Sequence, residues 1–377
     1  MRLAFCNATR RWGGVKTWSI EFAAALRELG HELILYGRDS AFIDRARAHG
    51  LEAYAVAFGC DYNPLSTAYF YRQFQSRRIQ AVLVNVGKDL RTAGLAARLL
   101  NLPLVQRIGL PRDMRDSLTT RLSHRLLRPH YLCPCRYIRN GLLEALPFVH
   151  EDDTSVVYSA KNPLPEIPDR VNSPLRILSS SQVNANKGHK ELAHTLALLK
   201  KEGHAFHWDV AGEGDCLEEL RALCATLGLE KEVTLHGFTQ NLSALLRAGD
   251  VFVLSSYTEG LPNTLLEGMA SGLAPVGRSV GGVRECWPDA LPFLLVPYAG
   301  WEQDADWHER AGAGAPALPL YAPLRQVLCA SPEQTLQWKR EAWEHCRTNF
   351  ALPVQAKKLE SFFEQRLARI DKRRVTG

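Results

Sequence analysis

Short apolar runs alternate with amphipathic segments along the first half of the chain. Runs long enough for buried strands stand at residues 3–6, 32–36 and 81–86. Between the first two, Trp18, Phe22 and Leu26 recur at helical spacing, and Gly30 follows where a helix would end. Parallel strands need crossover connections, which helices usually provide. The pattern therefore predicts a parallel sheet that is covered by helices on both faces.

A proline-rich stretch interrupts this alternation, which then resumes. Pro163, Pro165 and Pro168 stand in a segment that cannot readily form a helix or a central strand, so we place a domain linker there. Further strands are predicted at residues 175–178, 208–211, 233–236, 251–254 and 274–276. Residues 298–319, rich in glycine, alanine and proline, are predicted as an irregular loop. The sequence thus predicts an α/β protein, whose two Rossmann-like domains and C-terminal helix are expected at residues 1–168, 169–349 and 350–377.

Length and composition are those of a well-packed protein in a reducing compartment. At 377 residues the chain suits about two domains, and 46% apolar with 23% charged residues excludes extensive disorder. The sequence shows neither a signal-peptide pattern nor an apolar span of membrane-crossing length. Its nine cysteines are scattered, and Cys133 and Cys135 lack a second pair to complete a zinc site. We therefore expect reduced thiols and a cytoplasmic protein.

Positive charge is concentrated in the segment from Arg112 to Arg139, which contains seven arginines and only two acidic residues. Arg121, Arg125 and Arg128 recur at helical spacing and would share one face of a helix. One interpretation is an ordinary solvated helix face. The other is a surface that binds an anionic membrane carrying a lipid-linked acceptor, so that the protein is peripheral on the inner face of the membrane. Nucleic acid is not expected as a partner, because no binding fold or stacking motif accompanies the charge.

The strongest chemical pattern follows the strand predicted at residues 251–254. Open α/β sheets hold their ligands at the carboxyl ends of the strands. Glu259 would lie in the loop after this strand, and Glu267 about one to two turns into the next helix. Backbone N–H groups near residues 261–264 would stand at the positive end of that helix. A diphosphate or a sugar hydroxyl suits such a place.

A second loop, Gly13-Gly14, lies between the first strand and the first helix, where it would either approach a phosphate or form a plain tight turn. Together with this loop, the chain closely resembles the retaining glycosyltransferase family 4, which has the GT-B fold. The resemblance rests on Glu259 and Glu267 in a Glu-x7-Glu pair, on residues 187–189, 268–272 and 281–285, and on Gly13-Gly14. These motifs cover both halves of the chain in the family's order.

The resemblance implies two Rossmann-like domains that face each other across a cleft. The first would bind the acceptor, the second would bind the nucleotide sugar, and the C-terminal helix would return to the first domain. The implied reaction moves a sugar from a nucleoside-diphosphate sugar to a glycan or lipid-linked acceptor, with retention of anomeric configuration. Bacterial surface-polysaccharide or lipopolysaccharide assembly is the commonest setting for such chains.

The resemblance also implies roles for individual residues. Glu267 would bind the donor ribose, because a carboxylate can accept hydrogen bonds from two neighbouring hydroxyls. Glu259 would contact the transferred sugar and Lys187 would neutralise the departing diphosphate, which makes these two the expected catalytic residues. Gly237 and Phe238 would hold the base. The expected donor site comprises Gly13, Gly14, Gln182, Lys187, Gly237, Phe238, Glu259, Gly260, Leu261, Pro262, Asn263, Thr264 and Glu267.

The chain departs from the family's pattern at two places. The family usually supplies an arginine five residues before the lysine, where this chain has Gln182. Candidates for the missing charge are Lys16, Arg107 and Arg278. The family also places a histidine after the strand that contains Leu104, and this chain has none there. Candidates for the acceptor side are Asn85, Lys88 and Arg107, although each also suits an ordinary loop.

Neither a metal ion nor a cofactor is expected, because Lys187 and backbone N–H groups would stabilise the leaving diphosphate. Asp304 and Asp306 fall in the predicted irregular loop and are interpreted as a solvated surface pair. Two other functions stay open. One is a sugar-nucleotide epimerase of the same architecture, and the other is a non-catalytic sugar-nucleotide-binding protein. The Glu-x7-Glu pair favours transfer over the epimerase, and the presence of Lys187 together with both glutamates argues against a non-catalytic protein.

Overall fold

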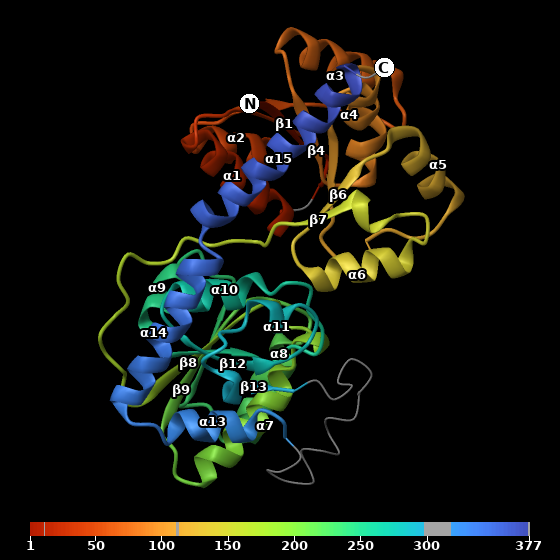
Figure 1. Ribbon diagram of the computed structural model, residues 1–377. Coiled ribbons are helices and arrows are strands. Elements are labelled where there is room, and N and C mark those ends of the chain that lie inside the picture. Colours follow the sequence, from red (N-terminus) through yellow and green to blue (C-terminus); the bar gives the residue numbers. More distant parts are fainter. Residues whose placement is uncertain (11, 111–112, 298–317, 376–377) are drawn as a thin grey trace. The chain divides into compact units, whose positions relative to one another are not determined.

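The computed structural model describes the backbone of residues 1–10, 12–110, 113–297 and 318–375 (Figure 1). The chain forms two compact units. We call residues 1–159 with 352–377 the first domain, and residues 160–351 the second domain. Each domain contains one parallel sheet flanked by helices. The predicted α/β class with two Rossmann-like sheets is therefore confirmed.

The domain limits differ from the predicted ones at residues 168 and 349. The proline-rich stretch belongs to the second domain, because backbone groups there are bonded to it. Leu164 N donates to Ala270 O over 2.8 Å, and Trp343 Nε1 donates to Leu164 O over 3.0 Å. Proline prevents regular structure in a segment, but it does not prevent the segment from packing on a domain. The chain thus enters the second domain before its prolines rather than after them.

The first domain is built on a seven-stranded sheet with the order β3-β2-β1-β4-β5-β6-β7. Its strands are β1 (Arg2–Asn7), β2 (Glu32–Gly37), β3 (Glu52–Ala55), β4 (Ala81–Val84), β5 (Leu104–Arg107), β6 (His130–Cys133) and β7 (Thr154–Val156). Its helices are α1 (Gly14–Glu28), α2 (Ser40–Ala48), α3 (Pro64–Ser76), α4 (Gly87–Leu99), α5 (Leu118–Leu127), α6 (Arg136–Ala145), η1 (Glu151–Asp153) and α15 (Leu352–Val375). Helix α15 packs against α1. The strand order reverses between β1 and β4, and open sheets bind ligands at such a reversal.

The second domain repeats this plan with six strands in the order β10-β9-β8-β11-β12-β13. Its strands are β8 (Leu175–Ser180), β9 (Phe206–Ala211), β10 (Val233–Gly237), β11 (Val251–Leu254), β12 (Ala274–Arg278) and β13 (Leu295–Val296). Its helices are η2 (Ala185–Lys187), α7 (His189–Lys201), α8 (Leu217–Thr226), α9 (Leu242–Ala248), α10 (Asn263–Ala270), α11 (Val283–Cys286), η3 (Pro292–Leu294), α13 (Tyr321–Leu328) and α14 (Pro332–Asn349). The order reverses between β8 and β11. The loop predicted at residues 298–319, with its two aspartates, lies outside the described residues except at its last two positions.

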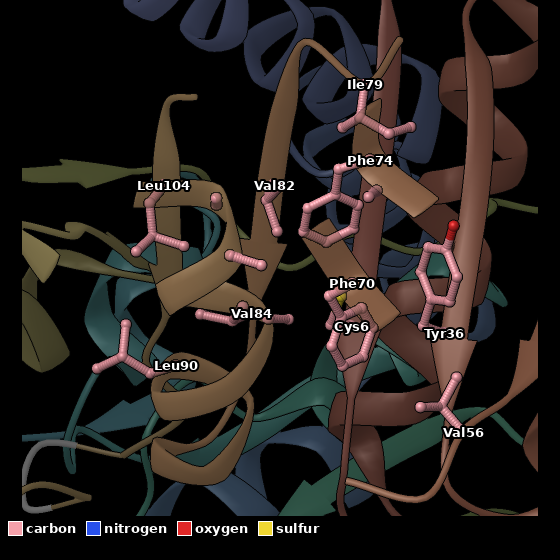
Figure 2. Packing of buried hydrophobic residues seen from close by; sticks show 14 of the residues in the cluster. Cys6, Tyr36, Val56, Phe70, Phe74, Ile79, Val82, Val84, Leu90 and Leu104 are labelled. Atoms are coloured by element: carbon pink, nitrogen blue, oxygen red, sulfur yellow. The ribbon is translucent and has the colours of Figure 1, made fainter. Parts of the chain in front are cut away.

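Aromatic side chains fill the core of the first domain between the sheet and α3. Phe70 and Phe74 are four residues apart, so they share the buried face of this helix. Both rings pack edge-on against Tyr36 of β2, with ring centroids 5.5 and 6.0 Å away. Figure 2 shows this cluster together with Val82 and Val84 of β4. The packing fixes the strands whose carboxyl ends carry the candidate residues of this domain.

Two further facts concern the cysteines and the helices of the described residues. None of the nine cysteines, all of which lie among the described residues, forms a disulfide, and most of them are buried. None of the described helices is long and apolar enough to cross a membrane.

Candidate functional site

Three loops meet at the carboxyl edge of the second sheet. They follow β8, β11 and β12, which are neighbours in the sheet. The carboxyl ends of parallel strands lie at the same edge. Lys187, Glu259 and Gly281 therefore stand on adjacent loops, although they are far apart in the sequence.

Lys187 and Glu259 form an ion pair between the first two of these loops. The distance from Nζ to Oε1 is 2.6 Å, and the side chains are only 21% and 12% exposed. The same loops are also joined through their backbones. Ser255 Oγ donates to Lys187 O over 2.6 Å, and Tyr257 N donates to Asn186 O over 2.9 Å. The structure thus brings together the two residues that the sequence predicts as catalytic.

Glu267 contacts a different cation. It lies in the second turn of α10, and its Oε1 is 2.8 Å from Nζ of Lys161. Among the described residues, no ion pair joins Glu267 to Lys187. Lys161 is the second residue of the second domain and is distant from Glu267 in the sequence, so no sequence motif pointed to it. The candidate site in the second domain therefore contains two lysine–glutamate pairs.

A fully buried ion pair supports these loops. Arg278, at the end of β12, pairs with Glu191 of α7, and neither side chain is exposed. Arg278 also donates to the backbone oxygen of Ser255, and its guanidinium carbon lies 4.7 Å from the ring centroid of Tyr257. Tyr257 Oη donates to Glu191 Oε2 over 2.9 Å. The guanidinium of Arg278 is thus buried and bonded within the domain, where a diphosphate cannot reach it. The hypothesis that Arg278 supplies the missing diphosphate charge is wrong.

Glycines let the three loops approach each other backbone to backbone. A Cβ at Gly281 would lie 1.9 Å from the carbonyl oxygen of Glu259, and one at Gly188 would lie 2.1 Å from that of Ser255. Both glycines also have positive φ, at 56° and 66°, a region that other residue types rarely adopt. The placement of Glu259 therefore depends on a glycine in the neighbouring loop.

The other residues expected at the donor lie in loops or helix starts at strand ends of the second sheet. The loop after β11 and the start of α10 contain the buried Gly260, Leu261 and Pro262 and the partly exposed Asn263 and Thr264. Gln182 is exposed after β8. Gly237 ends β10 with φ 63°, and the adjacent Phe238 is 71% exposed. An exposed aromatic ring beside a strand end can pack against a planar base.

Two further expected residues, Gly13 and Gly14, belong to the first domain. Gly13 is the N-cap of α1 and Gly14 is its first residue, and both are exposed. Lys16, in the first turn of the same helix, is buried and forms an ion pair with Asp39. The side chain of Lys16 is only 2% exposed, so its ammonium does not provide the accessible positive charge that the sequence suggested.

A cavity of about 420 Å³ opens at the carboxyl edge of the first sheet, and Val15, Asn85 and Arg107 are among its lining residues. Lys88 lies elsewhere. Its Nζ donates to Gly59 O over 2.8 Å and stands 3.8 Å from a carboxylate oxygen of Asp61. The structure therefore brings Asn85 and Arg107 together and separates Lys88 from them, because successive helix residues point in different directions.

Asp89 organises this edge of the first sheet, and sequence reasoning missed it. Its carboxylate is fully buried and accepts hydrogen bonds from Ala8 N, Asn85 N and Val86 N over 2.7, 3.1 and 3.1 Å. These bonds join the loops after β1 and β4. Burial raises the pKa of Asp89 to about 7. An acidic residue in the first turn of a helix was the only signal in the sequence.

The second domain matches a known family. Residues 174–305 match the family described as Glycosyl transferases group 1. The matched segment contains Lys187, Glu259 and Glu267. The resemblance that the motifs indicated is therefore confirmed for this part of the chain.

Curated relatives match over a similar length. The amylovoran biosynthesis glycosyltransferase AmsK of Erwinia amylovora is 33% identical over 137 residues, which is 34% of this chain and 34% of that protein. The N-acetylgalactosamine-N,N'-diacetylbacillosaminyl-diphospho-undecaprenol 4-alpha-N-acetylgalactosaminyltransferase of Campylobacter jejuni is 34% identical over 121 residues, or 32% of each chain. The chain thus spans about a third of the length of the curated relatives it matches.

Solved structures extend the likeness of fold to the whole chain. A glycosyltransferase from Rickettsia africae superposes with a TM-score of 0.76 at 17% identity, covering 97% of this chain and 98% of that one. HepE of Anabaena, solved in complex with UDP, gives 0.74 at 16% identity, covering 97% and 100%. The chain therefore has the GT-B fold of glycosyltransferases, and its residues 174–305 match the group 1 glycosyltransferase family.

We predict that Arg278→Met destabilises the second domain by about 3–5 kcal/mol, because it leaves the Glu191 carboxylate buried without its partner. Urea denaturation followed by tryptophan fluorescence measures the change. The control Arg347→Met removes an exposed pair with Glu344 and should leave the midpoint almost unchanged. Adding Glu191→Leu to Arg278→Met should recover much of the loss. Equal midpoints for the two single variants would show that the buried pair does not support the domain.

Proposed function

We propose that this chain is a retaining glycosyltransferase. It would move a sugar from a nucleoside-diphosphate sugar to a glycan or lipid-linked acceptor in surface-polysaccharide or lipopolysaccharide assembly. One observation carries the proposal. Lys187 Nζ lies 2.6 Å from Glu259 Oε1 at the ends of adjacent strands, and both residues belong to the segment that matches group 1 glycosyltransferases. The names of the two relatives, one from amylovoran biosynthesis and one acting on a diphospho-undecaprenol glycan, support the setting.

The chemistry of the sheet edge suits a sugar diphosphate. The ammonium of Lys187 provides a point charge for the diphosphate, and the backbone N–H groups at the start of α10 add partial positive charge. Glu267 would bind the ribose hydroxyls in the role that the family resemblance gives it. Gly237 and Phe238 would hold the base, and uridine is the first one to test, because HepE was solved with UDP.

The reaction breaks the bond between the sugar's anomeric carbon and the diphosphate oxygen. Negative charge grows on the diphosphate while positive charge grows on the sugar ring. Lys187 would stabilise the negative charge on the diphosphate, and the carboxylate of Glu259 would stabilise the positive charge on the sugar. Interactions between oriented charges are stronger in a site shielded from solvent than in water. We propose that these groups and the backbone N–H groups suffice without a metal ion. The acceptor hydroxyl would form the new bond on the face that the diphosphate leaves, and its proton would pass to the departing diphosphate, so that the configuration is retained.

We predict that Lys187→Met and Glu259→Gln each lower kcat for sugar transfer by about 10²–10³-fold, because each removes a charge that acts on the transition state. Transfer from labelled UDP-, GDP- and ADP-sugars to a panel of glycan and lipid-linked acceptors measures the effect. The control Lys201→Met removes an exposed ammonium from α7 and should retain full activity.

The same assay separates the two alternative functions. Epimerised nucleotide sugar formed without any acceptor would contradict transfer and support an epimerase. Donor binding by calorimetry, with neither transfer nor slow donor hydrolysis, would support a non-catalytic sugar-nucleotide-binding protein.

We further propose that the first domain docks on an anionic membrane surface through α5, where the enzyme would work on the inner, cytoplasmic face. Leucines four residues apart leave one stripe of this helix open to solvent: Leu118, Leu122 and Leu126 are 80%, 63% and 54% exposed. The flanking basic residues, also exposed, are Arg121, Arg125 and Arg128. An apolar stripe with arginine beside it is typical of a helix that lies in the interface of a bilayer.

We predict that the wild-type chain floats with vesicles containing anionic phospholipid at low salt and is released at high salt. Two double variants should each abolish flotation. Leu118→Ser with Leu122→Ser removes apolar surface that would enter the bilayer interface. Arg125→Gln with Arg128→Gln removes two basic residues, each of which contributes about 1 kcal/mol near the membrane surface. Arg221→Gln with Arg325→Gln is the control, because it removes two exposed arginines from the second domain. A wild-type chain that stays in the dense fraction at low salt would rule out this surface.

A further inference from the structure

Arg107 is a buried cation with no ion-pair partner among the described residues. It ends β5, is 7% exposed, and its guanidinium carbon lies 4.5 Å from the ring centroid of Trp18. Burial lowers the pKa of Arg107 to about 10, so the side chain remains charged at neutral pH. A buried charge is costly unless an opposite charge or a polar ligand compensates it. Stacking on an aromatic face compensates only part of that cost.

The charged groups around Arg107 compensate its charge only in part: the carboxylate of Asp113 offsets some of the lowering of the Arg107 pKa, but among the described residues it forms no ion pair with Arg107. The carboxylate of Asp113 accepts hydrogen bonds from Gly109 N and Leu110 N over 2.8 and 2.7 Å, and it is committed to that turn. The other arginines that line the cavity are Arg91, which pairs with Asp61 over 2.8 Å, and the exposed Arg115. The cavity therefore has a net positive lining, with Arg107 as its buried cation.

The same cavity wall has unused hydrogen-bonding capacity. Asn85 and Gln106 are buried lining residues, and the side-chain oxygen of each has no hydrogen-bond donor among the described residues. Asn85 is held in place because its Nδ2 donates to Cys6 O over 2.9 Å. Sugar hydroxyls are donors for such oxygens. The volume of about 420 Å³ lies in the range of small-ligand sites.

We infer that this cavity binds an acceptor sugar bearing an oxyanion, either a carboxylate or a phosphate, which pairs with Arg107. The inference rests on the proposed transfer and adds the chemical class of the acceptor. A guanidinium presents a planar fork of donors that fits both oxyanions in bidentate fashion. The strands β1, β4 and β5 are neighbours, so the Gly13-Gly14 loop, Asn85 and Arg107 stand at one edge of the first sheet. Arg107 is thus a specificity residue rather than a substitute for the missing donor-site arginine.

The test compares three soluble probes on the full chain with UDP present: glucose, glucuronate and glucose 6-phosphate. Saturation-transfer NMR and calorimetry measure their binding without any need for turnover. We expect at least one charged probe to bind roughly tenfold or more tightly than glucose, as one bidentate charged pair would give. The charged probe that binds better identifies the oxyanion as carboxylate or phosphate.

Arg107→Met should abolish the preference for the charged probe, and Arg107→Lys should retain part of it, because the charge remains and the fork is lost. The control Arg72→Met removes an exposed arginine from α3, outside the cavity, and should change nothing. UDP affinity should be equal in all four proteins. Equal affinities of the wild type for the three probes would overturn the inference, as would an Arg107→Met variant that keeps the preference.

The two proposals fail in distinguishable ways. If the wild type transfers sugar to a neutral acceptor and Arg107→Met leaves KM for that acceptor unchanged, the acceptor class is wrong while transfer stands. If UDP and sugar nucleotides do not bind the second domain at all, the proposed function fails irrespective of what the cavity binds.

Discussion

The buried ion pair between Arg278 and Glu191 is the constraint on which the carboxyl edge of the second sheet depends. Two opposite charges that are removed from water are costly to separate, because either one alone would be an uncompensated buried charge. The phenol of Tyr257 contacts both members of the pair. Through Arg278 the end of β12 is bonded to the loop after β11 at Ser255. That loop continues directly to Glu259. The position of the Glu259 carboxylate is therefore set by charges that are buried from solvent.

Close approach between backbone segments is the second constraint on the loops at this sheet edge. Gly281 and Gly188 leave no room for a side chain against the carbonyls of Glu259 and Ser255, so three loops form one rigid edge. On that edge Lys187 is paired with Glu259 and shielded from water. A diphosphate would bring two negative charges to the ammonium and compete with Glu259 for it. Donor binding would then free the carboxylate at the point where positive charge develops on the sugar.

Much of the fold and part of the site follow from the sequence. Alternating apolar runs gave the parallel sheets, and the rule that ligands lie at strand ends located the loops with Lys187 and Glu259. Spacing fixes the element and the loop on which a residue lies. It does not fix the direction of its side chain, and Lys88 and Arg278 were misplaced for this reason. Partners from distant segments, such as Lys161 for Glu267 and Glu191 for Arg278, leave no local pattern, because they meet only after the chain has folded.

The most direct test of the central claim is a crystal structure of the chain bound to UDP or to a UDP-sugar. The account predicts that a diphosphate oxygen lies within about 3 Å of Lys187 Nζ, at hydrogen-bonding distance, with the Glu259 carboxylate turned toward the sugar position. A diphosphate bound elsewhere, with Lys187 still paired to Glu259, would contradict it.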